Sequence, residues 1–123
     1  MLRKLTSALA IAVALIGSQI VADPAHASLS QCQAGQFCTW KGYTYSGAMY
    51  YYTYSPTCYD IGPDWDNRIV SVYNNSGAHG VYLYNNHGCN SAGGIRYVPP
   101  GVAYPDLCKL DWACLWASSL RFT

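Results

Sequence analysis

The sequence predicts an all-β fold. Short apolar or aromatic runs are broken by Gly, Asn, Pro and Ser, and no apolar stripe with a helical period extends beyond two turns. All six cysteines lie after residue 27, as expected for a small β-domain held together by disulfides. These observations favour one disulfide-linked β-domain.

The N-terminal segment 1–27 is a predicted secretory signal. Arg3 and Lys4 precede an apolar run, and the small-x-small pattern Ala25-His26-Ala27 is typical of a signal peptidase site. A single transmembrane anchor is the alternative, but the apolar run is short for a bilayer core and is interrupted by polar residues. We therefore expect a secreted, extracellular protein with one domain at residues 28–123.

The expected mature chain carries almost no net charge. Loss of Arg3, Lys4 and Asp23 leaves five basic residues and five aspartates from the original seven basic and six acidic side chains. Without a basic stripe, neither a nucleic acid nor an anionic membrane is an expected partner. Neither a GxSxG nor an HExxH signature occurs, so no enzymatic activity and no catalytic residue are predicted.

Six strands are predicted from alternating or β-branched and aromatic segments, each ended by turn-forming residues. The segment "NNSG" at residues 74–77 is a predicted turn, and "PPG" at residues 99–101 interrupts the chain again. The predicted strands are residues 37–41, 48–54, 69–74, 80–85, 94–98 and 118–122.

The second predicted strand, "AMYYYTY", is unusually rich in tyrosine. Alternation places Tyr50, Tyr52 and Tyr54 on one face, and Tyr51 on the other. If one face is core, the other shows an aromatic ring to solvent. Two interpretations remain open, a tyrosine-rich core and a dedicated binding stripe.

The six cysteines predict three disulfides, which sequence alone can pair in 15 ways. Three cysteines precede residue 75 and three follow it, so an odd number lies in each half. If all six pair, at least one disulfide must join the two halves. The cysteines are Cys32, Cys38, Cys58, Cys89, Cys108 and Cys114.

A weak internal repeat divides the domain into two units, about 28–77 and 78–123. An aromatic strand followed by a Gly-rich hairpin occurs in each, with Trp40 in the first unit corresponding to Tyr84 in the second. Late in each unit, Ser71 and Ser119 correspond in the same way. Two packed Greek-key units would explain the repeat.

The first unit resembles a βγ-crystallin Greek key. Trp40, Tyr45 and Gly47 match the family's pattern of aromatic, four residues, aromatic, one residue, glycine, and Ser71 matches its late serine. In the second unit, Cys89 and Ser91 stand where an aromatic residue and a glycine are expected. The resemblance implies a sandwich or barrel of two Greek keys.

Within that fold, the chain is similar to the small secreted metalloproteinase inhibitors of actinobacteria, the Streptomyces metalloproteinase inhibitor-like family. The similarity is carried by "CQAGQFCTW", "DWDNRIVSVYNNSG", "VYLYNNHGC", "VPPGVAYPDL" and "ASSLRF". It implies a monomeric inhibitor of an extracellular protease that binds through a substrate-like loop. The implied inhibitory loop is His87, Gly88, Cys89, Asn90 and Ser91.

Two other functions are open on the same fold. One is a killer-toxin-like or antimicrobial protein that acts through its tyrosine surface, and the other is a structural or calcium-binding protein of the cell envelope.

The stretch "DWDNRIVSV" contains a candidate calcium site. In the βγ-crystallin calcium motif, carboxylate, carbonyl and hydroxyl oxygens surround the ion, and Asp66, Asn67 and Ser71 fit it. Val70 replaces a hydroxyl ligand, however, and Cys114 and Leu115 replace both acids of the second unit. We therefore expect no cofactor. Zinc is not expected either, because no third ligand accompanies His79 and His87.

Overall fold

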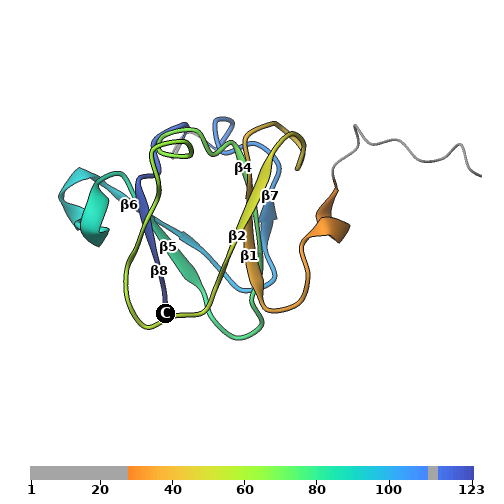
Figure 1. The fold of residues 1–123 in the computed structure, drawn as a ribbon, viewed down its shortest axis with the longest axis horizontal. Coiled ribbons are helices and arrows are strands. Elements are labelled where there is room, and N and C mark those ends of the chain that lie inside the picture. The colour runs from red at the N-terminus through yellow and green to blue at the C-terminus, as the bar shows by residue number, and fades with distance from the viewer. Residues whose placement is uncertain (1–27, 111–113) are drawn as a thin grey trace, which may run out of the picture.

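The computed structural model describes residues 28–110 and 114–123, and the predicted signal at 1–27 lies outside this part of the chain. The described residues form two four-stranded antiparallel sheets that face each other (Figure 1). Within these residues, no helix is both long and apolar enough to cross a membrane. The all-β prediction is confirmed.

Each unit contributes three strands to one sheet and one strand to the other. The first sheet has the order β2, β1, β4, β7 and the second has the order β3, β8, β5, β6. The strands of the first unit are β1 (Gln36–Trp40), β2 (Met49–Thr53), β3 (Tyr59–Asp60) and β4 (Ser71–Asn75). Those of the second are β5 (Val81–Tyr84), β6 (Ile95–Val98), β7 (Ala103–Tyr104) and β8 (Ser119–Phe122). The exchange of β3 and β7 joins the two Greek keys.

Six of the eight strands match the predicted ones within a few residues, whereas β3 and β7 were not predicted. Both are only two residues long, too short to show a period-two pattern. Strand β4 also begins at Ser71, two residues after the predicted start at Ile69. Ile69 and Val70 are buried nonetheless, and the N–H of Val70 donates to the carbonyl of Trp40.

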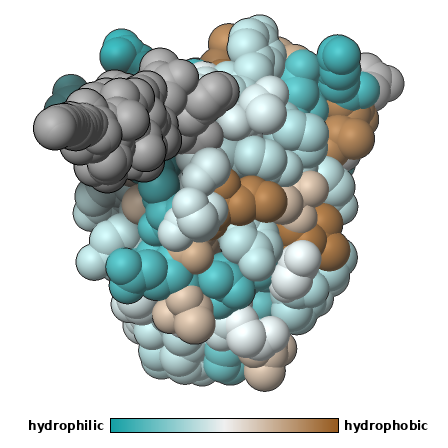
Figure 2. Space-filling model, turned by 90° about the vertical axis from the view of Figure 1, so that its right-hand side faces the viewer, coloured by the Kyte–Doolittle hydropathy of each residue, from teal (hydrophilic) through white to brown (hydrophobic). Residues whose placement is uncertain are grey.

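The core lies between the sheets and is mainly aliphatic. Its largest buried side chains include Phe37, Leu83 and Leu120, which are inaccessible to solvent. The buried amide of Asn74 is satisfied, because its Nδ2 donates to the carbonyls of His79 and Val98. Figure 2 shows one face of the molecule, where hydrophobic residues form only small patches between hydrophilic ones.

Strand β2 is at the edge of its sheet, which decides how its tyrosines are used. Tyr52 is 7% exposed and belongs to the core, whereas Tyr50 and Tyr51 on opposite faces are 51% and 48% exposed. An edge strand is covered on fewer sides than a central one, so both of its faces can show rings to solvent. The strand therefore supplies one core tyrosine and an exposed aromatic surface.

Three disulfides link the domain, as predicted. Cys32–Cys38 and Cys108–Cys114 each close a short segment with a separation of 6 residues. Cys58–Cys89 spans 31 residues and is the disulfide between the two halves that the odd cysteine counts require.

Candidate functional site

Each unit contains a hairpin at the corresponding place in its Greek key, and the two hairpins have similar backbone conformations. We call residues 42–47 the first corner hairpin and residues 86–91 the second corner hairpin. Thr44 and Tyr45 have φ of 53° and 57°, and their counterparts in the second unit, Gly88 and Cys89, have φ of 71° and 52°. Two successive left-handed residues are rare outside glycine. The predicted repeat is therefore visible in the backbone itself.

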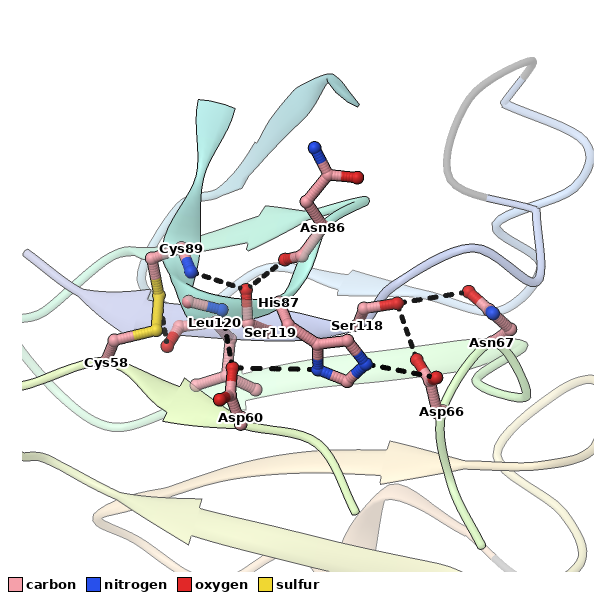
Figure 3. A network of polar contacts seen from close by, with 11 residues as sticks. Cys58, Asp60, Asp66, Asn67, Asn86, His87, Cys89, Ser118, Ser119 and Leu120 are labelled. Atoms are coloured by element: carbon pink, nitrogen blue, oxygen red, sulfur yellow. Dashed lines mark hydrogen bonds and ion pairs between the residues drawn. A yellow bond between two sulfur atoms is a disulfide. The ribbon is translucent and has the colours of Figure 1, made fainter. Parts of the chain in front are cut away.

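A buried serine holds each hairpin with the same pair of hydrogen bonds. The hydroxyl of Ser71 donates to the carbonyl of Gly42 at 2.8 Å and accepts from the N–H of Tyr45 at 3.0 Å. In the second unit, Ser119 donates to the Asn86 carbonyl at 2.5 Å and accepts from the Cys89 N–H at 2.9 Å (Figure 3). The two serines that correspond in the sequence repeat thus hold both hairpins.

The hairpins differ in what their side chains do. In the first, the Tyr45 ring packs edge-on against buried Trp40 with the ring centroids 5.3 Å apart. In the second, Cys89 takes the place of that tyrosine and forms the disulfide with Cys58. A covalent link to the β2–β3 connection replaces an aromatic contact. Figure 1 shows this second hairpin projecting from one end of the molecule near β6.

Two carboxylates hold the second corner hairpin from the side of the first unit. His87 lies between them, with its Nδ1 3.7 Å from Asp60 Oδ1 and its Nε2 3.3 Å from Asp66 Oδ2 (Figure 3). Asp60 Oδ1 also accepts the Gly88 N–H at 2.6 Å. Exposed contacts of this kind each contribute little to stability, about 1 kcal/mol or less. Their consequence is geometric, because they fix the direction of the hairpin.

The structure brings all five predicted loop residues together on one surface segment. His87, Gly88, Asn90 and Ser91 are exposed and Cys89 is half-buried. Asn90 has an extended backbone, with φ of −88° and ψ of 119°, and its Oδ1 accepts the N–H of Ala92 at 2.8 Å. The segment is therefore held at Asn86, Gly88 and Cys89, while the side chains of His87 and Asn90 remain exposed.

The candidate calcium residues are divided between two places. Asp66 and Asn67 lie beside Ser118, whose hydroxyl donates to Asp66 Oδ1 at 2.5 Å, whereas Ser71 is buried under the first corner hairpin. The second oxygen of Asp66 faces His87. In the described part of the chain, no three His, Cys, Asp or Glu side chains form a group that could hold a metal ion. The structure thus places Ser71 apart from the other two candidate residues, Asp66 and Asn67.

Sequence patterns did not connect the second corner hairpin with Cys58 and Asp60, which hold it from outside. Cys58 and Asp60 come from the segment that includes β3, whose two residues had no detectable strand pattern. Two aspartates of "YDIGPDWDN", Asp60 and Asp66, flank His87. A cysteine shortly before an aspartate was the only signal, and it is a weak one.

Comparison with solved structures gives several βγ-crystallin domains. A βγ-crystallin from Ciona intestinalis superposes with a TM-score of 0.59 at 16% identity, over 72% of this chain and all of that one. A βγ-crystallin from an archaeon gives a TM-score of 0.59 at 18% identity, over 74% of this chain and all of that one. A Ca²⁺-bound βγ-crystallin domain from Neurospora crassa gives a TM-score of 0.56 at 10% identity, over 74% of this chain and 91% of that one. These similarities show the fold, and they confirm the predicted βγ-crystallin-like architecture.

At the level of sequence, the model of peptidase inhibitor family I36 matches residues 25–98, more than half of the chain. The match includes the whole of the second corner hairpin. Among curated proteins, none matches the chain significantly.

Proposed function

Because the chain belongs to peptidase inhibitor family I36 and is an inhibitor rather than an enzyme, we propose that its target is a metalloproteinase and that its inhibitory segment is the second corner hairpin. The same proposal includes secretion after removal of residues 1–27 and action as a monomer on an extracellular protease. The family match supports the inhibitory activity, and the target class and the segment are our inference.

The observation that carries the proposal is an exposed loop whose backbone is held in place. The disulfide Cys58–Cys89, the Ser119 hydroxyl and the Asp60 carboxylate restrain the hairpin from three different elements. Binding a flexible segment costs conformational entropy, and a segment already held in shape avoids most of that cost. The hairpin is therefore suited to bind a peptidase cleft while its tip remains accessible.

A zinc peptidase would engage this segment as it engages a substrate. A backbone carbonyl near Cys89 or Asn90 would bind the metal, which acts on carbonyl oxygens as a Lewis acid, and the next side chain would enter the adjacent pocket. If the peptide bond were cut, the disulfide and the Ser119 hydrogen bonds would keep the upstream part of the loop in place. The products would then separate slowly, and inhibition would persist.

The direct test is titration of the mature protein, residues 28–123, against a thermolysin-type zinc peptidase. The protein should be produced by secretion so that its disulfides form. We expect residual activity to fall linearly to an endpoint near one inhibitor per enzyme when enzyme is well above Kd. Undiminished activity at micromolar excess, or inhibition of a serine peptidase alone, would contradict the target class.

Matched variants test the segment. The double variant His87→Ala, Asn90→Ala removes two exposed side chains of the second corner hairpin, and Tyr43→Ala, Ser46→Ala removes those at the corresponding positions of the first. We expect inhibition to weaken at least about tenfold in the first variant and less than about twofold in the second. Equal effects in both would place the inhibitory segment elsewhere. Near-ultraviolet circular dichroism of each variant controls for folding.

A further inference from the structure

Away from the second hairpin's exposed tip, a groove of about 530 Å³ lies between the edge strands of the two sheets. One wall is β2 and the other is formed by β3 and the loop that follows it. We call it the edge groove. The residues that line it are Tyr50, Tyr51, Tyr52, Thr53, Tyr59, Asp60, Gly62, Pro63, Asp64 and Trp65.

Four aromatic rings form a continuous row along this groove. Trp65 and Tyr50 have centroids 5.9 Å apart, Tyr50 and Tyr52 are 5.1 Å apart, and Tyr52 and Tyr59 are 5.2 Å apart. Only Tyr52 is fully part of the core, so the other rings contribute accessible aromatic surface. Such a row, in which Tyr50 is exposed and Tyr59 and Trp65 are half-buried, can bind a flat or cationic group by stacking.

The charge of the groove is negative. Asp60 and Asp64 line it, and none of its described lining residues is Lys, Arg or His. The chain's own Lys41 lies just beyond one end, where its Nζ is 4.8 Å from the Trp65 ring. This contact shows that the aromatic row already binds an ammonium group at its rim. Aromatic faces beside carboxylates suit a guanidinium group, which stacks on rings and donates two parallel hydrogen bonds to a carboxylate.

The wall at β2 also offers unpaired backbone groups. The N–H of Lys41 donates to the carbonyl of Ala48, so these two residues form a hydrogen-bonded pair between β1 and β2. Such pairs recur at every second residue of an antiparallel ladder, so Tyr50 and Tyr52 also bond to β1. Alternate residues then turn their N–H and C=O groups away from β1. The Thr53 carbonyl confirms this direction, since it accepts the Tyr59 hydroxyl at 2.9 Å. Tyr51 directs its backbone groups toward the open edge, where an added strand can pair with them.

From these observations we propose that the edge groove binds an extended polypeptide segment that carries an arginine. The segment adds to the free edge of β2, and its guanidinium stacks on the aromatic row and pairs with Asp64. The site is separate from the second corner hairpin, and the proposal does not rest on inhibition of a metalloproteinase. Asp60 belongs to both regions, because it accepts the Gly88 N–H, so Asp64 is the residue to vary.

The experiment measures binding of the peptide acetyl-Thr-Val-Arg-Val-Thr-amide to the disulfide-intact mature protein by NMR titration. We expect saturable shifts of the Tyr51 and Thr53 amide signals. A peptide with citrulline in place of arginine should bind at least about fivefold more weakly, since it keeps the shape and loses the charge. A peptide N-methylated at alternate residues should bind at least about tenfold more weakly, since it cannot pair with β2.

Variants of the protein complete the test. Asp64→Asn and Tyr50→Ala should each weaken binding at least about fivefold and leave inhibition of any peptidase unchanged. The matched control is Tyr97→Ala, because Tyr97 is an exposed tyrosine on β6, the corresponding edge strand of the second sheet. It should leave peptide binding unchanged, and thermal unfolding of each variant controls for folding.

Several results would overturn the proposal. They are absence of binding at millimolar peptide, equal binding of the arginine and citrulline peptides, equal binding of the N-methylated peptide, and equal loss in Tyr97→Ala. Saturable shifts of the same amides with cellohexaose but not with the peptide would identify a glycan site instead. Concentration-dependent dimerisation that covers the Tyr51 amide would identify a second copy of the chain as the occupant.

Discussion

The two corner hairpins share a backbone and a serine lock, yet they are sealed by different means. The first is closed by the packing of the Tyr45 ring against Trp40. The second is closed by the disulfide Cys58–Cys89, which leaves the neighbouring side chains exposed. A covalent brace fixes a loop without covering it with rings. The first hairpin is thus filled by packed rings, whereas the second keeps side chains exposed for the inhibitory role that we propose.

The largest expected loss of stability comes from removing the aromatic contact that closes the first corner hairpin. Trp40→Ala should lower the free energy of unfolding by about 4 kcal/mol, because Trp40 is fully buried and packs against Tyr45. Tyr84→Ala, at the corresponding position, should cost less, since Cys89 stands where Tyr45 would pack. Urea unfolding of both variants measures the difference. A larger loss for Tyr84→Ala would show that the aromatic contact is not what closes the first hairpin.

Removal of the disulfide Cys58–Cys89 should cause the next largest loss of stability. Chain entropy assigns about 4 kcal/mol to a disulfide that spans 31 residues and about 2 kcal/mol to one that spans 6. The double variant Cys58→Ala, Cys89→Ala should therefore lose more stability than Cys32→Ala, Cys38→Ala. Amide hydrogen exchange should accelerate at residues 88 and 89 in the former variant alone. Similar exchange in both would indicate that hydrogen bonds suffice to hold the second hairpin.

Removing the serine that holds each hairpin should have a smaller effect on stability, and the two units can be compared directly. Ser71→Ala and Ser119→Ala each leave a hairpin carbonyl and an N–H without their buried hydroxyl partner, at a cost of about 1–3 kcal/mol. Ser119→Ala should cost less stability, because the disulfide still holds its hairpin, but it should weaken inhibition more. Chemical denaturation together with inhibition constants measures both quantities. Equal inhibition by the two variants would argue against the second hairpin as the inhibitory segment.

The smallest expected effect depends on pH and belongs to the first hairpin. Burial raises the pKa of the Tyr45 phenol above its usual value of 10.0, whereas Cys89 in its disulfide does not titrate. The folded protein thus holds this proton more tightly than the unfolded chain. Stability should be insensitive to Tyr45 below pH 10 and should fall above it.

Urea unfolding at pH 8 and pH 10.5, for the wild type and Tyr45→Phe, measures this alkaline loss. The variant should lose less stability between the two pH values. Burial also raises the pKa of Tyr52, which contributes the same alkaline loss in both proteins. An identical pH dependence in the two proteins would show that Tyr45 is not protected in the folded state.

Local patterns were sufficient where a single segment carries the information. Alternation and turn residues predicted six strands, and the recurrence of a serine late in each unit predicted that Ser71 and Ser119 occupy corresponding places. The correspondence between Trp40 and Tyr84 likewise marks the two hairpins. Strands β3 and β7 were missed because such short strands carry no periodicity, and pairing in the opposite sheet defines them.

The sequence by itself determined an all-β, disulfide-linked fold of two Greek keys, and an odd number of cysteines in each half required a disulfide between them. Only the tertiary structure decided that Cys58 is the partner of Cys89, that His87 lies between Asp60 and Asp66, and that Ser118 rather than Ser71 accompanies Asp66. It alone placed the edges of β2 and β3 on either side of a groove. The physical reason is that these contacts join segments far apart in the sequence, and their geometry follows from the exchange of strands between the sheets.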